Sequence, residues 1–522
     1  METNFREGDR GKILGRMIHD RTLKLIQKFG ISNPAPIEIP VKVTLNKEIA
    51  GNRNAQLSFL TTINLLSRLT NRVVLEDVPN VQVSVWHPIG ISENLEERAF
   101  EIPKLINLPA VVEPPLTTIN IGQSNEIHNQ INIGNEGWTA IAIGDGTAIP
   151  RVDRVFNPLS SIFSSCLGVS EAFKEILSAL GSSRLYNHRN IRYSLLKFSS
   201  SSDLGGSEIK YPLGASLGEL TIIGAGALGE SFLYNLASGK HKGNIQVIDD
   251  DEIEASNLNR LLFADKNTSG NKSSFVANSL ENTELTCHPY PESYEKFASN
   301  GTKVLETVIS LVDDRNQNST RRNIQSDLPK SLYHLATGTE TLSMTMLRVD
   351  FENGPCLGCL FPSEAPQNDY HAEIYEATGL SEERVKELLN GSRISSSDIK
   401  VIAEKNNRPI EELEFRQGEN LDTLLSKICG QMDIKTPSQT YNGSVGFLSL
   451  AAGTVLAARV VADILSIKGS SQLSYLQMSP ISPDDQVSLP FVKSNYCSIL
   501  CSTPIMQSRY KEKWNIVQPS SK

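Results

Sequence analysis

Hydrophobic residues recur along the chain with two different periods, which predict helices alternating with strands. Apolar positions at helical spacing predict helices over residues 55–69, 159–180 and 227–237. Short apolar runs predict buried strands over residues 81–86, 138–143, 219–223, 245–248 and 308–312. Helices that alternate with strands in this way are typical of an α/β fold.

The second half of the chain carries the most definite pattern. A strand, a glycine turn, a helix and a second strand follow one another within about 30 residues from Leu217. Two of the strands, at 245–248 and 308–312, end in aspartates. Because open parallel sheets bind ligands at the carboxyl ends of their strands, we expect a Rossmann-like doubly wound sheet whose site lies at those aspartates.

Changes in composition predict how the domains are organised. A chain of 522 residues is too long for one core. Residues 201–216 are rich in Ser and Gly and are interpreted as a linker, while 363–442 are polar and helical in character. We therefore expect an α/β domain at 1–200, a second domain formed by 217–362 and 443–522, and a helical insertion at 363–442.

One apolar run, Val445–Ile467, is long enough to resemble a membrane span. Arg459 and Asp463 interrupt it, and charged groups inside a membrane are costly. A core helix is therefore the preferred interpretation, and no membrane association is expected.

Composition narrows the classes of function. The chain is 39% hydrophobic and 21% charged, as in globular proteins, and its formal net charge of -9 argues against a general nucleic-acid binder. The N-terminus lacks the apolar segment of a secretory signal, which favours the cytoplasm. Seven cysteines in such a chain are better explained as thiols or metal ligands than as a disulfide framework.

The candidate nucleotide site begins at Gly224, which with Gly226 and Gly229 has the spacing G-x-G-x-x-G between a strand and a helix. The first glycine permits a tight turn, the second lets backbone amides approach a phosphate, and the third allows close helix packing. Asp249 ends the next strand, where a ribose hydroxyl is held in dinucleotide enzymes. An NAD(P)-dependent oxidoreductase shares all of these features.

Polar residues after Asp249 favour ATP over NAD(P). Asn257, Arg260 and Lys272 together can grip a triphosphate and stabilise charge on its α-phosphate. With Asp249, they resemble the superfamily of ubiquitin-activating, molybdopterin-synthase-activating and thiamine-synthesis adenylating enzymes, the ThiF and E1-like proteins. The resemblance covers 217–362 and 443–467 well and the first 200 residues weakly.

The resemblance implies roles for these residues. Asp249 binds ribose, Asn257 and Arg260 contact phosphates, and Lys272 reaches the α-phosphate. Asp313 holds Mg²⁺, although the family's usual spacing to the next arginine is shorter, so Asp314 is a competitor. The glycine-threonine segment at 335–340 resembles the family's strand beside the bound C-terminal tail.

Cysteine pairs suggest a zinc site. Cys356 and Cys359 form C-x-x-C, a spacing suited to two tetrahedral zinc ligands. Resembling enzymes often complete such a site with a second pair near the end of the adenylation core, here Cys497 and Cys501. The three residues between the second pair keep ordinary buried thiols open as the alternative.

Cys429 is the candidate nucleophile. Cys166 and Cys287 lie in apolar patterns, whereas Cys429 lies in the polar insertion near Lys427. In the ubiquitin-activating branch, a cysteine in such an insertion accepts the modifier as a thioester. A buried inert thiol is the alternative.

Members of the superfamily work as pairs, either as homodimers or as an active half with an inactive partner half. Residues 1–200 resemble the degenerate adenylation-like halves fused to bacterial activating enzymes, so the pair is expected to be a pseudo-dimer within the chain or a homodimer. An arginine reaching across to the triphosphate is also implied, and Arg53 is a candidate.

The resulting hypothesis is an E1-like enzyme that uses ATP and Mg²⁺ to adenylate the C-terminal glycine of a ubiquitin-like protein. Capture as a thioester and transfer to an E2-like carrier would follow, in a bacterial conjugation pathway such as antiviral defence. The alternatives are a sulfur-carrier adenylyltransferase, a non-catalytic partner subunit and an NAD(P) oxidoreductase.

Overall fold

The structure is a computed structural model of the 522-residue chain. It describes residues 21–26, 29, 31, 38–106, 114–122, 130–144, 148, 150–182, 190–200, 208–312, 319–338, 342–349, 351, 356–357, 378–389, 392–405, 410, 417, 444–487 and 504–516. The chain divides into two compact units. The first contains residues 1–360, 443–494 and 499–522, and the second contains 361–442 and 495–498.

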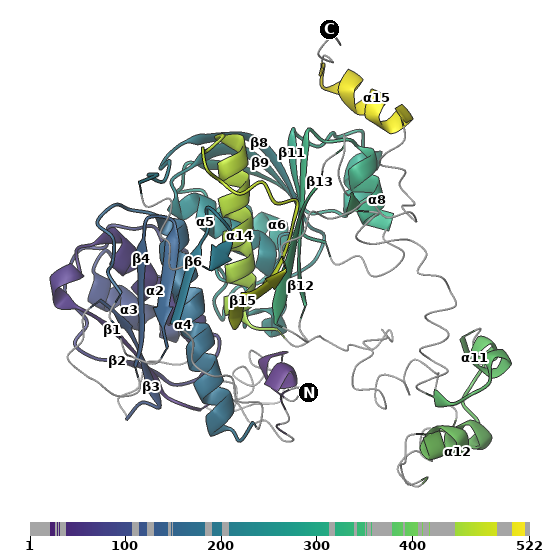
Figure 1. Ribbon diagram of the computed structural model, residues 1–522, viewed down its shortest axis with the longest axis horizontal. Helices are drawn as coiled ribbons and strands as arrows, with labels where there is room; N and C mark the ends of the chain where they lie inside the picture. Colours follow the sequence, from purple (N-terminus) through teal and green to yellow (C-terminus); the bar gives the residue numbers. More distant parts are fainter. Residues whose placement is uncertain are drawn as a thin grey trace, which may run out of the picture. The chain divides into compact units, whose positions relative to one another are not determined.

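The N-terminal half of the first unit is built on a seven-stranded sheet (Figure 1). In spatial order its strands are β2 (Val73–Leu75), β1 (Val41–Leu45), β3 (Thr117–Ile121), β4 (Gln130–Glu136), β5 (Thr139–Ile143), β6 (Asn190–Ser194) and β7 (Ser199–Ser200). Neighbours from β2 to β4 are parallel, and neighbours from β4 to β7 are antiparallel.

The C-terminal half of this unit contains an eight-stranded sheet. Its order is β10 (Leu285–Tyr290), β9 (Lys242–Ile248), β8 (Ser216–Ile223), β11 (Thr307–Ser310), β12 (Ser331–Gly338), β13 (Ser343–Val349), β14 (Tyr475–Ser479) and β15 (Ser482–Val487). Neighbours from β10 to β12 are parallel, and those from β12 to β15 are antiparallel.

The two halves follow one plan. Apart from β10, the strand orders correspond one to one, and each sheet changes from parallel to antiparallel at its corresponding strand, β4 or β12. Helix α2 (Arg53–Ser67) follows β1 as α5 (Ala227–Ser238) follows β8. Likewise α4 (Pro158–Ala179) lies between β5 and β6, and α14 (Gly446–Ile464) between β13 and β14. The predicted α/β class is confirmed, and the N-terminal half repeats the topology of the C-terminal half.

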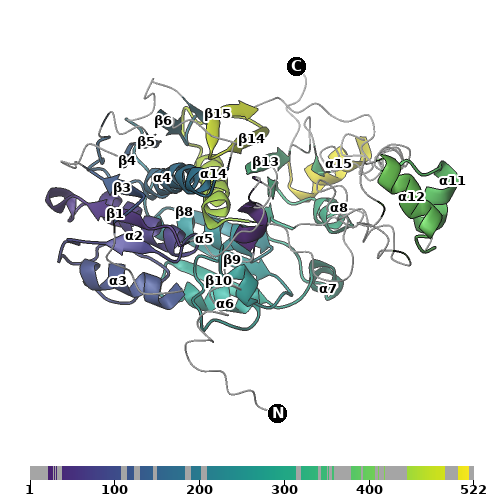
Figure 2. The same cartoon turned by 90° about the horizontal axis from the view of Figure 1, so that it is seen from below.

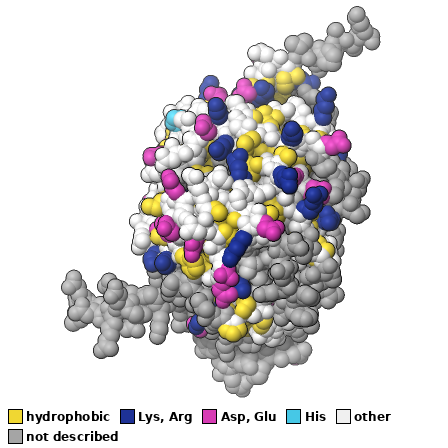
Figure 3. All heavy atoms as spheres, turned by 90° about the vertical axis from the view of Figure 1, so that its left-hand side faces the viewer, with side chains coloured by type: hydrophobic (Ala, Val, Ile, Leu, Met, Phe, Trp, Pro, Cys, Tyr) yellow, Lys and Arg dark blue, Asp and Glu magenta, His cyan; other side chains and the backbone are white. Residues whose placement is uncertain are grey.

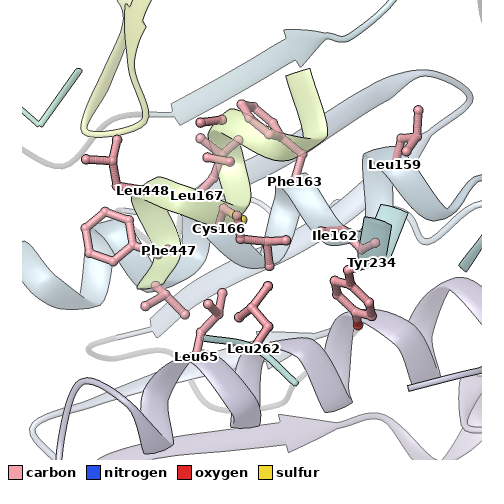
Figure 4. Packing of buried hydrophobic residues seen from close by; sticks show 14 of the residues in the cluster. Leu65, Leu159, Ile162, Phe163, Cys166, Leu167, Tyr234, Leu262, Phe447 and Leu448 are labelled. Carbon is pink, nitrogen blue, oxygen red and sulfur yellow. The ribbon is translucent and has the colours of Figure 1, made fainter. Parts of the chain in front are cut away.

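These four helices form the interface between the halves (Figures 1 and 2). Figure 4 shows Leu65 of α2, Phe163 of α4, Tyr234 of α5 and Phe447 of α14 in one buried cluster. The hydroxyls of Thr61 and Tyr234 form a 2.6 Å hydrogen bond across it. Because α2 and α4 pack between their own sheet and the other half, they are buried on nearly every face.

Helix α14 is the core helix expected from its interrupted apolar run. It is long and apolar enough to cross a membrane, but 89% of its most hydrophobic window is buried inside the protein. Arg459 is fully buried and donates from Nε to Asp463 at 2.8 Å and from Nη1 to the carbonyl oxygen of Ser471 at 2.6 Å. The charges that interrupt the run are thus paired within the fold.

The remaining helices lie outside this interface. In the first unit they are α3 (Leu95–Ile106), α6 (Lys272–Ser279), α7 (Tyr294–Ser299), α8 (Ser319–Ser326) and α15 (Pro504–Lys513). In the second unit α11 (Glu382–Leu389) and α12 (Ser396–Lys405) are joined by an ion pair of 2.8 Å between Arg384 and Asp398. Val385 and Ile399 are buried in this unit.

The predicted strand at 81–86 is wrong. Gln82 forms only an isolated bridge with Asn94. The side chain of Gln56 supplies the missing backbone partners, donating to Gln82 O at 2.9 Å and accepting from Ser84 N at 2.8 Å. A side chain from α2 thus takes the place of a neighbouring strand.

Part of the predicted linker packs against the N-terminal half. The indole N–H of Trp138 donates to Ile209 O at 2.9 Å, and the ring of Tyr211 lies 5.3 Å from the Trp138 ring. Residues 208–215 are therefore held in place before β8 begins.

Figure 3 shows one face of the molecule, on which basic and acidic side chains are interspersed. A nucleic-acid-binding face instead gathers basic side chains into a patch or stripe.

Candidate functional site

The glycine turn joins β8 to α5, and its glycines differ in what surrounds them. Gly224 has a φ of 104°, which side chains rarely tolerate. A Cβ on Gly229 would lie 2.4 Å from Gly224 O, so only glycine permits this approach. A Cβ on Gly226 would meet no described atom within 4 Å. The helix therefore begins beside open space, where its free N–H groups can bind a phosphate.

Asp249 follows β9 and is tied to this turn. One carboxylate oxygen accepts from Ala225 N at 2.6 Å, and the other accepts from Asp251 N at 2.9 Å. Burial raises its pKa above the ordinary value, while the charge of Lys272 opposes the rise. Asp249 thus braces the turn, and its role as a ribose ligand stays a prediction.

Lys272 begins α6 and lies at the same edge of the sheet. Its ammonium contacts Asp251 at 2.6 Å, and its side chain is only 13% exposed. Asn271, which the sequence analysis did not single out, caps α6 by accepting from Ser274 N and donates to Asp249 O at 2.9 Å. An asparagine directly before a helix is a recognisable capping signal.

Three consecutive aspartates could hold a cation at this edge. The carboxylate oxygens of Asp249, Asp250 and Asp251 lie within 4.8 Å of one another. Oxygen ligands of this kind suit Mg²⁺. Asp251 already pairs with Lys272, so binding of an ion would compete with that contact.

Asn257 ends a short 3-10 helix (Ala255–Asn257), and Arg260 lies on the turn that follows it. Asn257 is buried, and Arg260 donates to Ser256 O at 3.3 Å and to Asn259 Oδ1 at 3.2 Å. Burial lowers the pKa of Arg260 to about 9, and the positive charge of Arg21 lowers it further while Glu230 and Glu254 oppose this. Arg260 remains protonated at neutral pH.

Arg21 is a second cation near Arg260 that the sequence analysis did not identify. It lies in a short helical segment, residues 21–26, next to the Arg260 turn: Thr22 accepts from Asn259 at 3.2 Å, and Arg21 O accepts from Ser444 N at 3.2 Å. Two nearby like charges repel unless an anion lies between them. No motif around Arg21 distinguished it, because its proximity to Arg260 arises from contacts with residues distant in sequence, Asn259 and Ser444.

Arg53, the arginine expected to cross between the halves, lies at the start of α2. Its guanidinium carbon lies 3.8 Å from the centre of the Phe156 ring in the same half. Its role at the triphosphate stays a prediction.

In the corresponding turn of the N-terminal half, side chains at the start of α2 bond to the backbone of their own half. Asn52 and Asn54 lie where α2 begins, and their side-chain amides each donate to Asp153 O at 2.8 Å. Asn54 also donates to Val155 O at 2.9 Å, while Asn52 caps the helix. The α2 N-terminus thus has local partners at the position where α5 faces open space.

Several predicted site residues lie outside the described residues: Asp313, Asp314, Cys359, Cys429, Cys497 and Cys501. The strand before Asp313 does reach the site, since Leu311 O would lie 3.2 Å from a Cβ on Gly224. Cys356 is buried. The Mg²⁺ ligands, the zinc site and the thioester cysteine stay predictions, as do the roles assigned to the predicted domains.

Glu230, in the first turn of α5, gives a testable pH dependence. Burial raises its pKa to about 7 from 4.5, although Phe263 N–H donates to it and Arg68 lies near. The folded state therefore binds the carboxyl proton of Glu230 more tightly than the unfolded state does. The stabilisation that results is fully present below pH 4.5 and is lost as the pH rises to about 7. At about 1.4 kcal/mol per pH unit, the loss totals about 3 kcal/mol relative to a Glu230→Gln variant.

Chemical unfolding of the wild type and Glu230→Gln at pH 5 and pH 8 measures this difference. Glutamine retains an acceptor for Phe263 N–H, so the comparison isolates the charge. Stability differences that are equal at the two pH values would contradict a raised pKa.

Comparisons with known proteins agree with this geometry. The ThiF family model matches residues 215–495, which contain every residue of the glycine turn and of the Arg260 turn. A separate model, the BilD N-terminal domain, matches residues 40–195. The boundary between the two matches falls between the two sheets.

Individual relatives cover different parts of the chain. Uncharacterized protein y4jF of Sinorhizobium fredii is 27% identical over 414 residues, 74% of this chain and 76% of its own length. The adenylyltransferase and sulfurtransferase MOCS3 of Aedes aegypti is 30% identical over 148 residues, 28% of this chain and 33% of its own length. Among solved structures, E. coli MccB with MccA-N7isoASN has a TM-score of 0.36 at 16% identity, covering 55% of this chain and 67% of that chain.

Proposed function

The chain belongs to the ThiF family of the E1-like adenylating superfamily, and we propose that its C-terminal half adenylates the terminal carboxylate of a small protein with ATP and Mg²⁺. The observation that carries this proposal is the surroundings of the first turn of α5. Open space lies beside Gly226, where α5 begins. Asp249 and Lys272 lie along one edge of the turn, and Arg260 lies near Glu230 in the first turn of α5.

A triphosphate fits this charge distribution. The N–H groups at the start of α5 and the cations Lys272, Arg260 and Arg21 all favour a polyanion. Arg21 comes from the N-terminal segment, so it is a second candidate, beside Arg53, for an arginine supplied across the halves. The positive charge of Arg21 lowers the pKa of Arg260, as expected for two cations that lie near each other.

The reaction needs positioning and charge stabilisation. A carboxylate oxygen attacks the α-phosphorus, the bond to the bridging oxygen breaks, and pyrophosphate leaves with the electron pair. Lys272 and Arg260 would offset the charge that develops on the phosphate oxygens. Asp313 or Asp314, or the aspartates after β9, would hold Mg²⁺, which supplies further charge neutralisation. Substrate orientation would provide the rest of the acceleration.

We assign the substrate to the class of ubiquitin-like proteins that end in glycine. A terminal glycine can enter a narrow channel, because it has no side chain beside the reacting carboxylate. In the next step Cys429 of the polar insertion would attack the acyl-adenylate, so that AMP leaves and a thioester forms. Transfer to an E2-like carrier protein would follow. The pair of halves needed for this chemistry would be present within one chain.

A second candidate function is activation of a sulfur carrier without a thioester on the enzyme. The 148-residue similarity to a protein named adenylyltransferase and sulfurtransferase favours it. The match covers only 33% of that relative, so it concerns part of that protein alone.

Pyrophosphate exchange into ATP tests the first step. We expect exchange that depends on a small glycine-ending protein and disappears when its C-terminal carboxylate is converted to an amide. Exchange that is independent of the protein's C-terminus would overturn the proposed substrate.

Gel analysis of the same mixture separates the two candidate functions. An adduct of enzyme and small protein that is lost on reduction and in Cys429→Ala supports the thioester branch. Exchange without such an adduct supports the sulfur-carrier alternative, and an adduct that survives Cys429→Ala would exclude this cysteine.

A further inference from the structure

Arg68, at the C-terminal end of α2, bonds to the other half of the molecule. It is among the largest fully buried side chains. Nη1 donates to Leu258 O at 2.5 Å, and Nη2 donates to Leu262 O at 3.1 Å and to Ala264 O at 2.9 Å. One guanidinium from the N-terminal half therefore binds three carbonyl oxygens of the C-terminal half.

These carbonyls belong to residues 257–264, the segment referred to above as the Arg260 turn and from here on as the arginine turn. It contains Asn257 and Arg260. Leu258 lies before Arg260, and Leu262 and Ala264 lie after it. Within the turn, the amides of Arg260 and Leu261 donate to Asn257 O at 3.0 and 3.1 Å. Arg68 thus holds the backbone on both sides of the residue assigned to the phosphates.

Two further side chains support this arrangement. Asn64, one helical turn before Arg68, accepts from Arg68 Nε at 2.8 Å and donates to Leu262 O at 3.2 Å. From α5, Glu230 accepts from Phe263 N at 3.0 Å. Figure 4 shows Leu262 in the same buried cluster as Leu65 of α2. The turn is therefore held by α2 on one side and by the first turn of the nucleotide-site helix on the other.

A buried guanidinium suits this irregular backbone. A turn that is neither helix nor strand leaves carbonyl oxygens without regular partners, and such groups are costly when buried. Arginine carries five N–H donors in a fixed plane, and four of the bonds they can make are formed here. Burial lowers the pKa of Arg68 to about 10, while the charges of Glu230 and Asp265 oppose this, so the group stays charged at neutral pH.

We propose that Arg68 is a positioning residue, through which the N-terminal half holds the arginine turn in the geometry that binds the nucleotide. The inference rests on the proposed function, since it concerns the same site. Arg68 contacts backbone rather than nucleotide, so its effect reaches ATP through the placement of Asn257 and Arg260. The N-terminal half is therefore a working part of the active site.

Hydrogen exchange of the full-length protein tests the structural part of this proposal without any assay of activity. In Arg68→Met we expect the amides of Arg260, Leu261 and Phe263 to exchange about tenfold faster, while peptides from β4 are unchanged. Arg68→Lys retains the charge but lacks the planar set of donors. Its amides in the turn should exchange at rates between those of the wild type and of Arg68→Met. Arg72→Met is the matched control, because Arg72 lies four residues away, is 37% exposed and pairs with Glu38 at 3.6 Å.

Kinetics tests the functional part. We expect Arg68→Met to lower kcat/KM for ATP in pyrophosphate exchange by about 10- to 100-fold, with partial recovery in Arg68→Lys. KM for the small protein should change less than KM for ATP, a difference that general destabilisation would not produce. Unchanged hydrogen-exchange protection of the arginine turn, or uniformly faster hydrogen exchange across the C-terminal half, would overturn the proposal.

Two further outcomes keep the proposal testable. If Arg68→Met does not fold, Asn64→Leu removes one Arg68 contact and one bond to Leu262 and should loosen the same amides to a smaller degree. If the wild type shows no pyrophosphate exchange with any glycine-ending protein, the proposed function is wrong, and the hydrogen-exchange comparison still decides whether Arg68 holds the turn.

Discussion

Replacing Lys272 by alanine should lower pyrophosphate exchange by about 100-fold or more, because the variant loses a cation that pairs with Asp251 and whose charge acts on Asp249. The effect should appear mainly in kcat, since charge on the α-phosphate increases as the carboxylate attacks. Arg260→Ala should have a comparable effect and should also weaken ATP binding. Both rates are measured with saturating small protein while ATP is varied.

Lys266→Ala is the control for charge. Lys266 lies between the two residues in the sequence, but its ammonium donates to Lys104 O at 2.9 Å on the exposed side of the structure. Its replacement should leave exchange within about twofold of the wild type. Wild-type exchange in both Lys272→Ala and Arg260→Ala would falsify the assignment of the site.

Replacing Gly453 by valine should destabilise the protein by about 3 kcal/mol or more, because α14 and α5 touch at this residue. A Cβ on Gly453 would lie 2.5 Å from Ser231 Cβ and 2.7 Å from Phe232 N. Backbone cannot move aside as a flexible side chain can, so the two helices must separate. We expect a lower midpoint of thermal unfolding and less soluble protein.

Gly51→Val is the matched control for this substitution. A Cβ on Gly51 would meet no described atom within 4 Å, and the residue is exposed before the cap of α2. Its unfolding midpoint should stay close to that of the wild type. Equal midpoints for the two valine variants would show that the contact between α14 and α5 does not limit stability.

Local patterns predicted the parts of the fold whose causes lie in neighbouring residues. The glycine turn could be found because strand, turn and helix follow directly in sequence, and α14 could be interpreted as a core helix from two charges in an apolar run. The strand expected at 81–86 failed for the opposite reason. Its backbone groups bond to Gln56, which is distant in sequence, and no local period contains that information.

The residues of the candidate site also fall into those that local sequence patterns could predict and those that they could not. The positions of Gly224, Asp249, Arg260 and Lys272 were recognisable from spacing, because one strand-turn-helix unit and the segment after it carry them all. The contributions of Arg21 and Arg68 were not, because each lies far from Arg260 in the sequence and comes near it only through tertiary contacts.

The sequence by itself thus determined an α/β chain with a glycine turn between strand and helix, and it predicted a set of cations that favours ATP. Only the tertiary structure decided that the first 200 residues repeat the strand order of the C-terminal half apart from β10, and that one of their buried arginines bonds to the backbone on both sides of Arg260. Periodicity and motif spacing record interactions between residues close in sequence. The partners of an irregular buried turn are set by which distant groups the fold brings within hydrogen-bonding distance.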